Sequence, residues 1–147
     1  MKGARRIAVL AMGNELRGDD AVALEVAKRL KMREGAALKI FEAHTVPEAF
    51  VGPVCSAAPS HVLIIDAAEL GGKPGDWRVL EKDEIDDALV STHHMPATAM
   101  AGEIERRCGA KVTFIGIQPK SREVAVGLCS QCGKAANEIA ESILKAR

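Results

Sequence analysis

Aromatic side chains are scarce in this sequence of 147 residues, which contains three Phe, one Trp and no Tyr. Proteins that bind single-stranded nucleic acid by stacking its bases need an aromatic platform, and this chain lacks the residues for one. The charges also balance, because 20 Lys and Arg residues oppose 20 Asp and Glu residues. With no basic face evident, we expect no nucleic-acid partner.

Long apolar runs are also absent. The apolar run at residues 7–12 is too short to span a bilayer, and no small-residue cleavage site of a signal peptide follows it. Hydrophobic residues make up 48% of the chain and charged residues 27%, which is typical of a soluble globular protein. We therefore expect a cytoplasmic protein without membrane contact, folded as one domain over residues 1–147.

The chain has only four cysteines, which are Cys55, Cys108, Cys129 and Cys132. Without a secretion signal, a framework of disulfides is not expected. Cys129 and Cys132 form a CxxC motif, but no second CxxC or Cys/His pair lies at zinc-finger spacing. The motif alone fits plain thiols at a loop-to-helix junction, a redox pair or half of a zinc site.

Short apolar runs alternate with amphipathic stretches, which is typical of an α/β protein. The strongest predicted strand, residues 61–65, is continuously apolar after its first residue, which favours a central position in a parallel sheet. We expect a three-layer α/β/α sandwich with a mostly parallel twisted sheet and one antiparallel edge strand. The other predicted strands are residues 7–12, 38–41, 77–80 (the edge) and 111–117, and the main predicted helices are residues 20–35, 96–107 and 134–146.

Polar side chains follow several predicted strands, and open parallel sheets bind ligands beyond the carboxyl ends of their strands. Asp66 comes directly after residues 61–65, so its carboxylate is desolvated unless it meets a cation, a metal or a helix N-terminus. A role as a cap or turn residue explains Asp66 equally well. Asn14, His44 and Gln118 also follow predicted strands, so we expect all four side chains on one rim.

Asp19 and Asp20 lie at the start of the first predicted helix, where capping is the simpler explanation for carboxylates. His93 and His94 lie in a loop that leads to a helix start, and a polar loop without further role explains them equally well. Because adjacent side chains rarely face the same point, at most one of these histidines is expected to be a ligand.

Two carboxylates and an imidazole suit a divalent ion such as zinc, nickel or ferrous iron. The spacing of Asp20, Asp66 and His93 nevertheless matches no compact metal motif. The segment 13–18 lacks the glycine fingerprint of dinucleotide-binding loops and the Lys-Ser/Thr ending of a P-loop, and no nucleophile elbow occurs.

Four blocks of sequence, taken together, resemble one known family. Residues 12–20, Met-Gly-Asn-Glu-Leu-Arg-Gly-Asp-Asp, resemble the Gly-Asn-x-Leu-x-Gly-Asp-Asp opening of the [NiFe]-hydrogenase maturation proteases. Blocks similar to those of the same family follow in the same order at residues 62–67, 91–96 and 114–119. The resemblance covers nearly the whole chain and implies an α/β/α fold.

The resemblance also implies an activity, which is removal of a C-terminal extension from the precursor of a hydrogenase large subunit after nickel insertion. Carried over by motif position, Asp20, Asp66 and His93 are the implied catalytic residues and the ligands that recognise the nickel. The metal belongs to the substrate, so no cofactor of the protein's own is expected, although another divalent metal is expected to occupy the site in vitro.

Three features depart from the family pattern. Relatives often have a Gly-rich turn after the second strand, where this chain has Ala43 and His44. Family members often continue with Gly-x-Gly where this chain has residues 21–23, Ala-Val-Ala, and the CxxC motif is no part of the pattern. Two other hypotheses remain at this point. One is a non-catalytic nickel- or nucleotide-binding module on a flavodoxin-like sheet, and the other is an ordinary zinc hydrolase.

Overall fold

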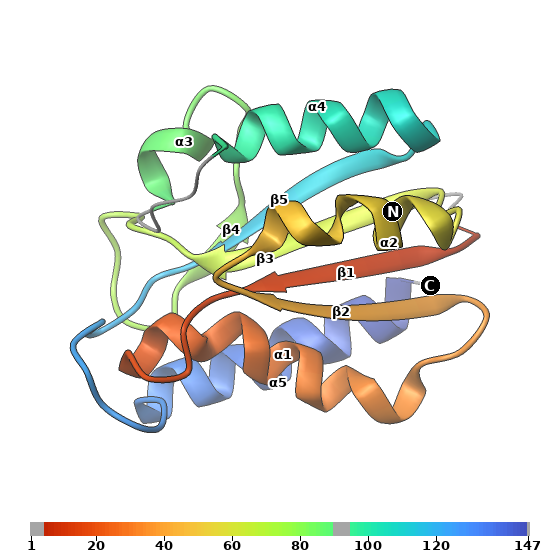
Figure 1. Cartoon of the computed structure of the whole chain (residues 1–147). Helices are drawn as coiled ribbons and strands as arrows, with labels where there is room; N and C mark the ends of the chain where they lie inside the picture. Colours follow the sequence, from red (N-terminus) through yellow and green to blue (C-terminus); the bar gives the residue numbers. More distant parts are fainter. Residues whose placement is uncertain (1–4, 90–94, 147) are drawn as a thin grey trace.

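The computed structural model of the chain describes residues 5–89 and 95–146, and within them five strands form one sheet in the order β2-β1-β3-β5-β4 (Figure 1). Four strands run parallel, and β4 pairs antiparallel with β5 at one edge. The predicted fold class is therefore confirmed. The strands are β1 (Ile7–Met12), β2 (Leu38–His44), β3 (His61–Ala67), β4 (Trp77–Val79) and β5 (Lys111–Ile117).

The strand β3 lies at the centre of the sheet, as its apolar sequence predicts. Residues 62–67 are all buried because both faces of the strand are covered. Since strand side chains alternate between the two faces, Leu63 and Ile65 pack into one apolar core, and Val62 and Ile64 pack into the other.

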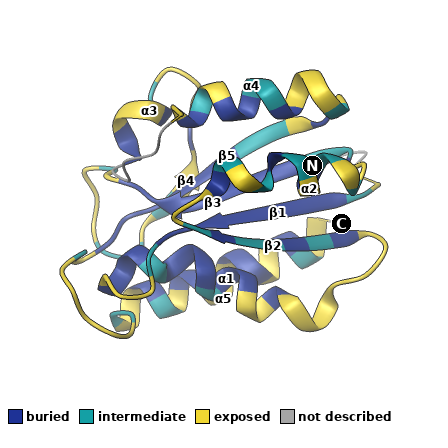
Figure 2. Ribbon diagram, in the orientation of Figure 1, coloured by how far each residue is buried: buried dark blue, intermediate teal, exposed yellow. Residues whose placement is uncertain are grey.

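Helices cover both faces of the sheet and complete the three layers (Figures 1 and 2). One core lies under α1 (Val22–Leu30) and α5 (Ser130–Ala146). The other lies under α2 (Val51–Ser56), α3 (Ile85–Ala88) and α4 (Ala97–Cys108). Short 3-10 turns add η1 (Gly18–Ala21), η2 (Lys31–Arg33) and η3 (Pro47–Phe50). No described helix has the length and apolar character needed to cross a membrane.

Several elements differ in length from their prediction. The helix α1 ends at Leu30 rather than near Gly35, and α5 begins at Ser130, so that it contains Cys132. The strand β3 continues to Ala67 because Asp66 pairs in register with Gly116 of β5. Asp66 therefore lies inside the central strand rather than beyond its end.

The four parallel strands end on the same side of the sheet, at Met12, His44, Ala67 and Ile117. We call this side the carboxyl edge. The turn η1 follows β1 there, and α4 also starts at this side of the molecule (Figure 1). The connections of the fold therefore carry Asp20 to the same edge of the sheet as the end of β3, which contains Asp66.

Candidate active site

The position of Asp20 depends on a tight return of the chain after β1. Gly13 has φ +150°, and a Cβ atom on it would lie 2.1 Å from the carbonyl oxygen of Asp20. Only glycine allows this approach without a rearrangement of the backbone. The N–H of Asn14 then donates to Oδ2 of Asp20 at 3.0 Å. These contacts hold the carboxylate of η1 against the end of β1.

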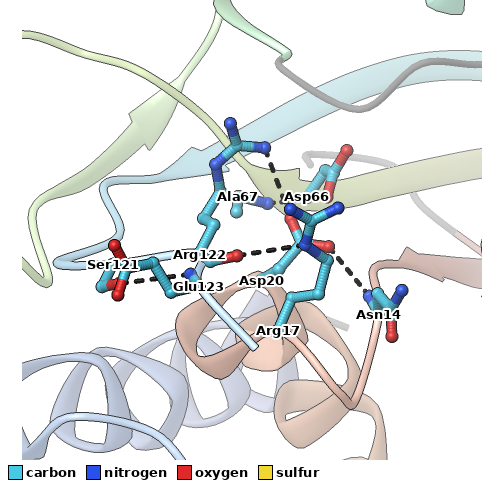
Figure 3. A network of polar contacts seen from close by, with 8 residues as sticks. All are labelled: Asn14, Arg17, Asp20, Asp66, Ala67, Ser121, Arg122 and Glu123. Carbon is cyan, nitrogen blue, oxygen red and sulfur yellow. Dashed lines mark hydrogen bonds and ion pairs between the residues drawn. The ribbon is translucent and has the colours of Figure 1, made fainter. Parts of the chain in front are cut away.

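The second oxygen of Asp20 is held without a hydrogen bond. Asp20 is only 5% exposed, and its buried Oδ1 has no hydrogen-bond partner among the described residues. Nη1 of Arg122 lies 3.9 Å away, at ion-pair distance (Figure 3). Burying a carboxylate oxygen without hydrogen bonds carries a desolvation cost. Within residues 5–89 and 95–146, the arrangement thus leaves one acceptor of Asp20 without a hydrogen bond.

Arg122 reaches Asp20 because its loop, residues 118–129, is anchored to the segment before Asp20. The N–H of Gly18 donates to the carbonyl of Ala125 at 2.9 Å, and the N–H of Asp19 donates to the carbonyl of Ser121 at 3.1 Å. The side chain of Arg17 donates from Nε to the carbonyl of Arg122 at 3.1 Å. Sequence reasoning did not identify Arg122, because this loop has no periodic pattern.

Asp66 is the second predicted carboxylate, and it is 1% exposed. Its Oδ1 accepts a hydrogen bond from the N–H of Ala67 at 2.8 Å. Since Ile65 and Ala67 face α1 and α5, alternation along β3 directs Asp66 toward the layer that contains α4. The turn η1 contacts β3, and Figure 3 shows Asp20 and Asp66 in one group of polar residues. The structure therefore brings two of the three predicted residues to the same part of the carboxyl edge.

The third predicted residue, His93, lies outside the described residues, as does His94. The first described helix after them, α4, begins at Ala97. The assignment of His93 to the site therefore stays a prediction.

Asp19 is adjacent to Asp20 but has a different environment. It is 3% exposed, its Oδ1 accepts from the N–H of Cys129 and its Oδ2 from the N–H of Lys120, both at 2.8 Å. Burial alone would raise the pKa of Asp19, but the hydrogen bonds from Cys129 and Lys120 outweigh it and lower that pKa below its usual value. Asp19 is thus an ionised anchor for the 118–129 loop.

Two further polar residues lie at the carboxyl edge, one at the end of β2 and one in the segment after it. His44 ends β2 with its Nδ1 3.4 Å from Oε1 of Glu15, and both side chains are about half exposed. Glu48, in η3, has a buried Oε2 without a hydrogen bond within the described part of the chain. Glu48 was noted in the sequence only as part of a family-like segment, and its burial could not be read from that segment.

The site combines two buried carboxylates with one arginine at the edge of a parallel sheet. Carboxylate oxygens are suitable ligands for a divalent cation, and Oδ1 of Asp20 has no competing hydrogen bond among the described residues. Arg122 provides positive charge opposite that oxygen. The arrangement can therefore accept a cation at Asp20 and Asp66 if the arginine is displaced.

Comparison with known proteins identifies the family. Residues 21–146 match the family profile described as hydrogenase maturation protease. A candidate hydrogenase maturation protease of Methanocaldococcus jannaschii is 32% identical over 128 residues, which are 82% of this chain and 76% of the relative. The hydrogenase 3 maturation protease of Escherichia coli is 28% identical over 112 residues, 76% of this chain and 71% of the relative.

Solved structures agree with the sequence matches. The crystal structure of the [NiFe] hydrogenase maturation protease HycI from Thermococcus kodakarensis superposes with a TM-score of 0.88 at 30% identity, covering 99% of this chain and 94% of that one. The hydrogenase maturating endopeptidase HybD of Escherichia coli shares the fold, with a TM-score of 0.73 at 23% identity over 96% and 91% of the two chains. The chain therefore belongs to the hydrogenase maturation protease family and is a peptide hydrolase of that class.

Proposed function

We propose that this endopeptidase removes the C-terminal extension of a [NiFe]-hydrogenase large-subunit precursor, and that Asp20, Asp66 and His93 recognise the nickel carried by that precursor. The observation that supports it most is the state of Asp20, a buried carboxylate with one oxygen that makes no hydrogen bond within the described residues. A fold that only needed a cap at this position would satisfy both oxygens, as it does at Asp19.

Nickel enters this proposal as part of the substrate. It is a borderline divalent ion that accepts both carboxylate oxygens and imidazole nitrogen. Asp20 and Asp66 would offer the oxygens and His93 the nitrogen, while the remaining ligands stay with the precursor. The protease then needs no metal cofactor of its own, and another divalent ion should bind the same side chains in vitro.

Arg122 would act as the counter-ion of Asp20 when no substrate is bound. Nη1 of Arg122 lies 3.9 Å from Oδ1 of Asp20. This distance is longer than a hydrogen bond, so the lone pairs of Oδ1 stay available to another ligand. An incoming cation repels the guanidinium and replaces it at Asp20. The side chain of Arg122 is 33% exposed, so its guanidinium can leave Asp20 and become hydrated in solvent.

Recognition of the metal would control cleavage by fixing the position of the scissile peptide bond. Hydrolysis adds water across one peptide bond, and holding that bond at a fixed place relative to the carboxylates lowers the entropic part of the barrier. A precursor without nickel lacks the group that the three side chains bind, so its peptide bond is not positioned. We propose that the reaction takes place in the cytoplasm.

The test uses the purified chain with nickel-loaded and nickel-free precursor in parallel, and the mass of the large subunit is followed by mass spectrometry. We expect the loaded precursor to be shortened with release of one peptide, and the nickel-free precursor to stay intact. Equal cleavage of both forms would refute nickel recognition. Binding of the loaded precursor without cleavage would support the non-catalytic nickel-binding module instead.

A further inference from the structure

The CxxC motif lies outside the proposed active site, yet it meets a carboxylate in space. Cys129 directly precedes α5 and Cys132 is the third residue of that helix. Asp19 reaches them from η1, and one ligand atom from each of the three residues lies within 4.8 Å of the other two. Among residues 5–89 and 95–146, this is the one such group of three or more His, Cys, Asp or Glu side chains.

We propose that Asp19, Cys129 and Cys132 form a second metal site, which binds a thiophilic divalent cation of the zinc class. Two thiolates and one carboxylate are ligands that zinc accepts, and a water molecule would complete a tetrahedral shell. The site would be distinct from the nickel-recognition site, because the latter contains no thiolate. This inference does not depend on the proposed proteolytic reaction.

Backbone N–H groups already orient two of the three ligands. The N–H of Cys132 donates to Sγ of Cys129 at 3.4 Å, which stabilises negative charge on that sulfur at the start of α5. The two oxygens of Asp19 each accept one N–H, from Cys129 and Lys120, and each retains a second lone pair. Ligands held by such supporting hydrogen bonds lose little freedom when a metal binds.

Once its thiols ionise, the cluster carries negative charge that a bound cation would neutralise. Burial and the nearby Cys129 and Asp19 raise the pKa of the Cys132 thiol, so without a metal this thiol is protonated and donates to the carbonyl of Gln118 at 3.4 Å. Bound as thiolates, Cys129 and Cys132 contribute two negative charges and Asp19 contributes a third, so one divalent ion leaves one net negative charge on the complex.

An entry route is also present. Cys132 is fully buried, but Cys129 is half-buried and lines a surface pocket together with Leu24, Ser130 and Gly133. A cation can therefore reach Cys129 from solvent, and the same opening offers room for the water ligand. A bound ion would tie η1 and the 118–129 loop to the start of α5.

The other two cysteines provide a matched control. Cys55 and Cys108 interact with each other, and both sulfurs approach the carbonyl of Ile104. Burial and the neighbouring Cys108 raise the pKa of Cys55 to about 11. Neither belongs to a described group of three candidate ligands, so this pair should not hold the ion.

The test is a titration of the reduced, metal-free, full-length protein with Co²⁺. Thiolate ligation produces a sulfur-to-cobalt charge-transfer absorption, which oxygen and imidazole ligands do not produce. We expect one equivalent of Co²⁺ to give this band. Cys129→Ser and Cys132→Ser should each weaken binding at least tenfold, whereas the Cys55→Ser/Cys108→Ser double variant should bind like the wild type.

A second measurement uses the wild type alone and so does not depend on the folding of any variant. Zn²⁺ should protect Cys129 from alkylation and leave the reactivity of Cys55 and Cys108 unchanged, as read by peptide mass. Absence of the thiolate band in reduced protein, or an equal band after loss of Cys129 and Cys132, would overturn the proposal. So would a reduced protein whose Cys129 is alkylated equally fast with and without Zn²⁺, which would indicate plain thiols or a redox pair.

Discussion

Asp19 and Asp20 are neighbours in the chain and nearly equally buried, but the hydrogen bonds of their carboxylates differ. Both oxygens of Asp19 accept backbone hydrogen bonds that close the 118–129 loop onto η1. Asp20 receives one backbone hydrogen bond, and its other oxygen faces Arg122 at 3.9 Å. The difference separates a carboxylate that joins two segments of the fold from one whose second oxygen has no hydrogen bond among the described residues.

Buried polar atoms without hydrogen bonds are rare in folded proteins, so each one needs an explanation. At Asp20 the proposed explanation is a ligand that arrives with the substrate. Asp19 shows that a carboxylate of η1 can accept hydrogen bonds at both oxygens, because the N–H groups of Lys120 and Cys129 reach it from the 118–129 loop. Oδ1 of Asp20, by contrast, accepts no hydrogen bond from the part of the chain that the structure describes.

The largest effect is expected from removing the proposed ligands. Asp20→Asn, Asp66→Asn and His93→Ala should each reduce precursor cleavage by at least about 100-fold, because each removes a group that binds the substrate's nickel. Circular dichroism should show folded proteins. The single-turnover rate of cleavage measures the effect, and near wild-type rates in all three variants would refute the site.

The close approach of the backbone at Gly13 to Asp20 can be tested by substitution of Gly13. Gly13→Ala should destabilise the protein by about 3 kcal/mol, because the new Cβ meets the carbonyl of Asp20 at 2.1 Å and φ is positive. Gly71→Ala is the matched control, since Gly71 also has a positive φ (+69°) but nothing within 4 Å of the added atom. Gly71→Ala should lower the free energy of unfolding, measured with urea, by about 1 kcal/mol. Equal losses of stability in the two variants would contradict the close approach of Gly13 to the carbonyl of Asp20.

The anchoring role of Asp19 predicts a smaller and pH-dependent loss. Asp19→Asn should lower the free energy of unfolding by about 2 kcal/mol at pH 7, because the amide places a donor opposite a backbone N–H. Asp87→Asn, at an exposed position, should change it by less than about 0.5 kcal/mol.

The pH dependence follows from the lowered pKa of Asp19 in the folded state. A depressed carboxylate pKa contributes stability that is fully present above the unfolded-state value, near 3.8, and is lost as pH falls below it through the folded-state pKa. The difference between wild type and Asp19→Asn should therefore shrink on acidification below about pH 4. A difference that stays constant from pH 7 to pH 3 would contradict the ionised anchor.

The smallest effect is expected at Arg122. Arg122→Gln removes the positive charge opposite Asp20, so a free divalent ion such as Ni²⁺ should bind the nickel-recognition residues about threefold more tightly. Calorimetric titration in a Cys129→Ser/Cys132→Ser background isolates this site from the thiol cluster. Weaker binding in the Arg122→Gln protein would show that the arginine supports the metal site instead of competing for it.

The layers and the order of polar residues could be predicted because they depend on local patterns. Apolar runs mark β1 and β5 with the same bounds as the structure, and the continuous apolar character of residues 62–65 indicates the central strand. The carboxyl ends of parallel strands share one edge, so Asp20 and Asp66 were expected there.

The remaining features depend on contacts between segments distant in sequence. The end of β3 at Ala67 follows from its pairing with β5, and Arg122 reaches Asp20 only through the hydrogen bonds that attach its loop to residues 16–19. Periodicity carries no information about either. The same holds for Asp19, whose predicted capping role is replaced by contacts with Lys120 and Cys129.

One experiment compares the two neighbouring carboxylates directly. Asp19→Asn and Asp20→Asn are assayed side by side for cleavage of nickel-loaded precursor, at a temperature where both variants are folded. We expect Asp19→Asn to cleave within about tenfold of the wild-type rate and Asp20→Asn to lose at least about 100-fold. Equal rates for the two variants, whether both active or both inactive, would contradict the division of roles between Asp19 and Asp20.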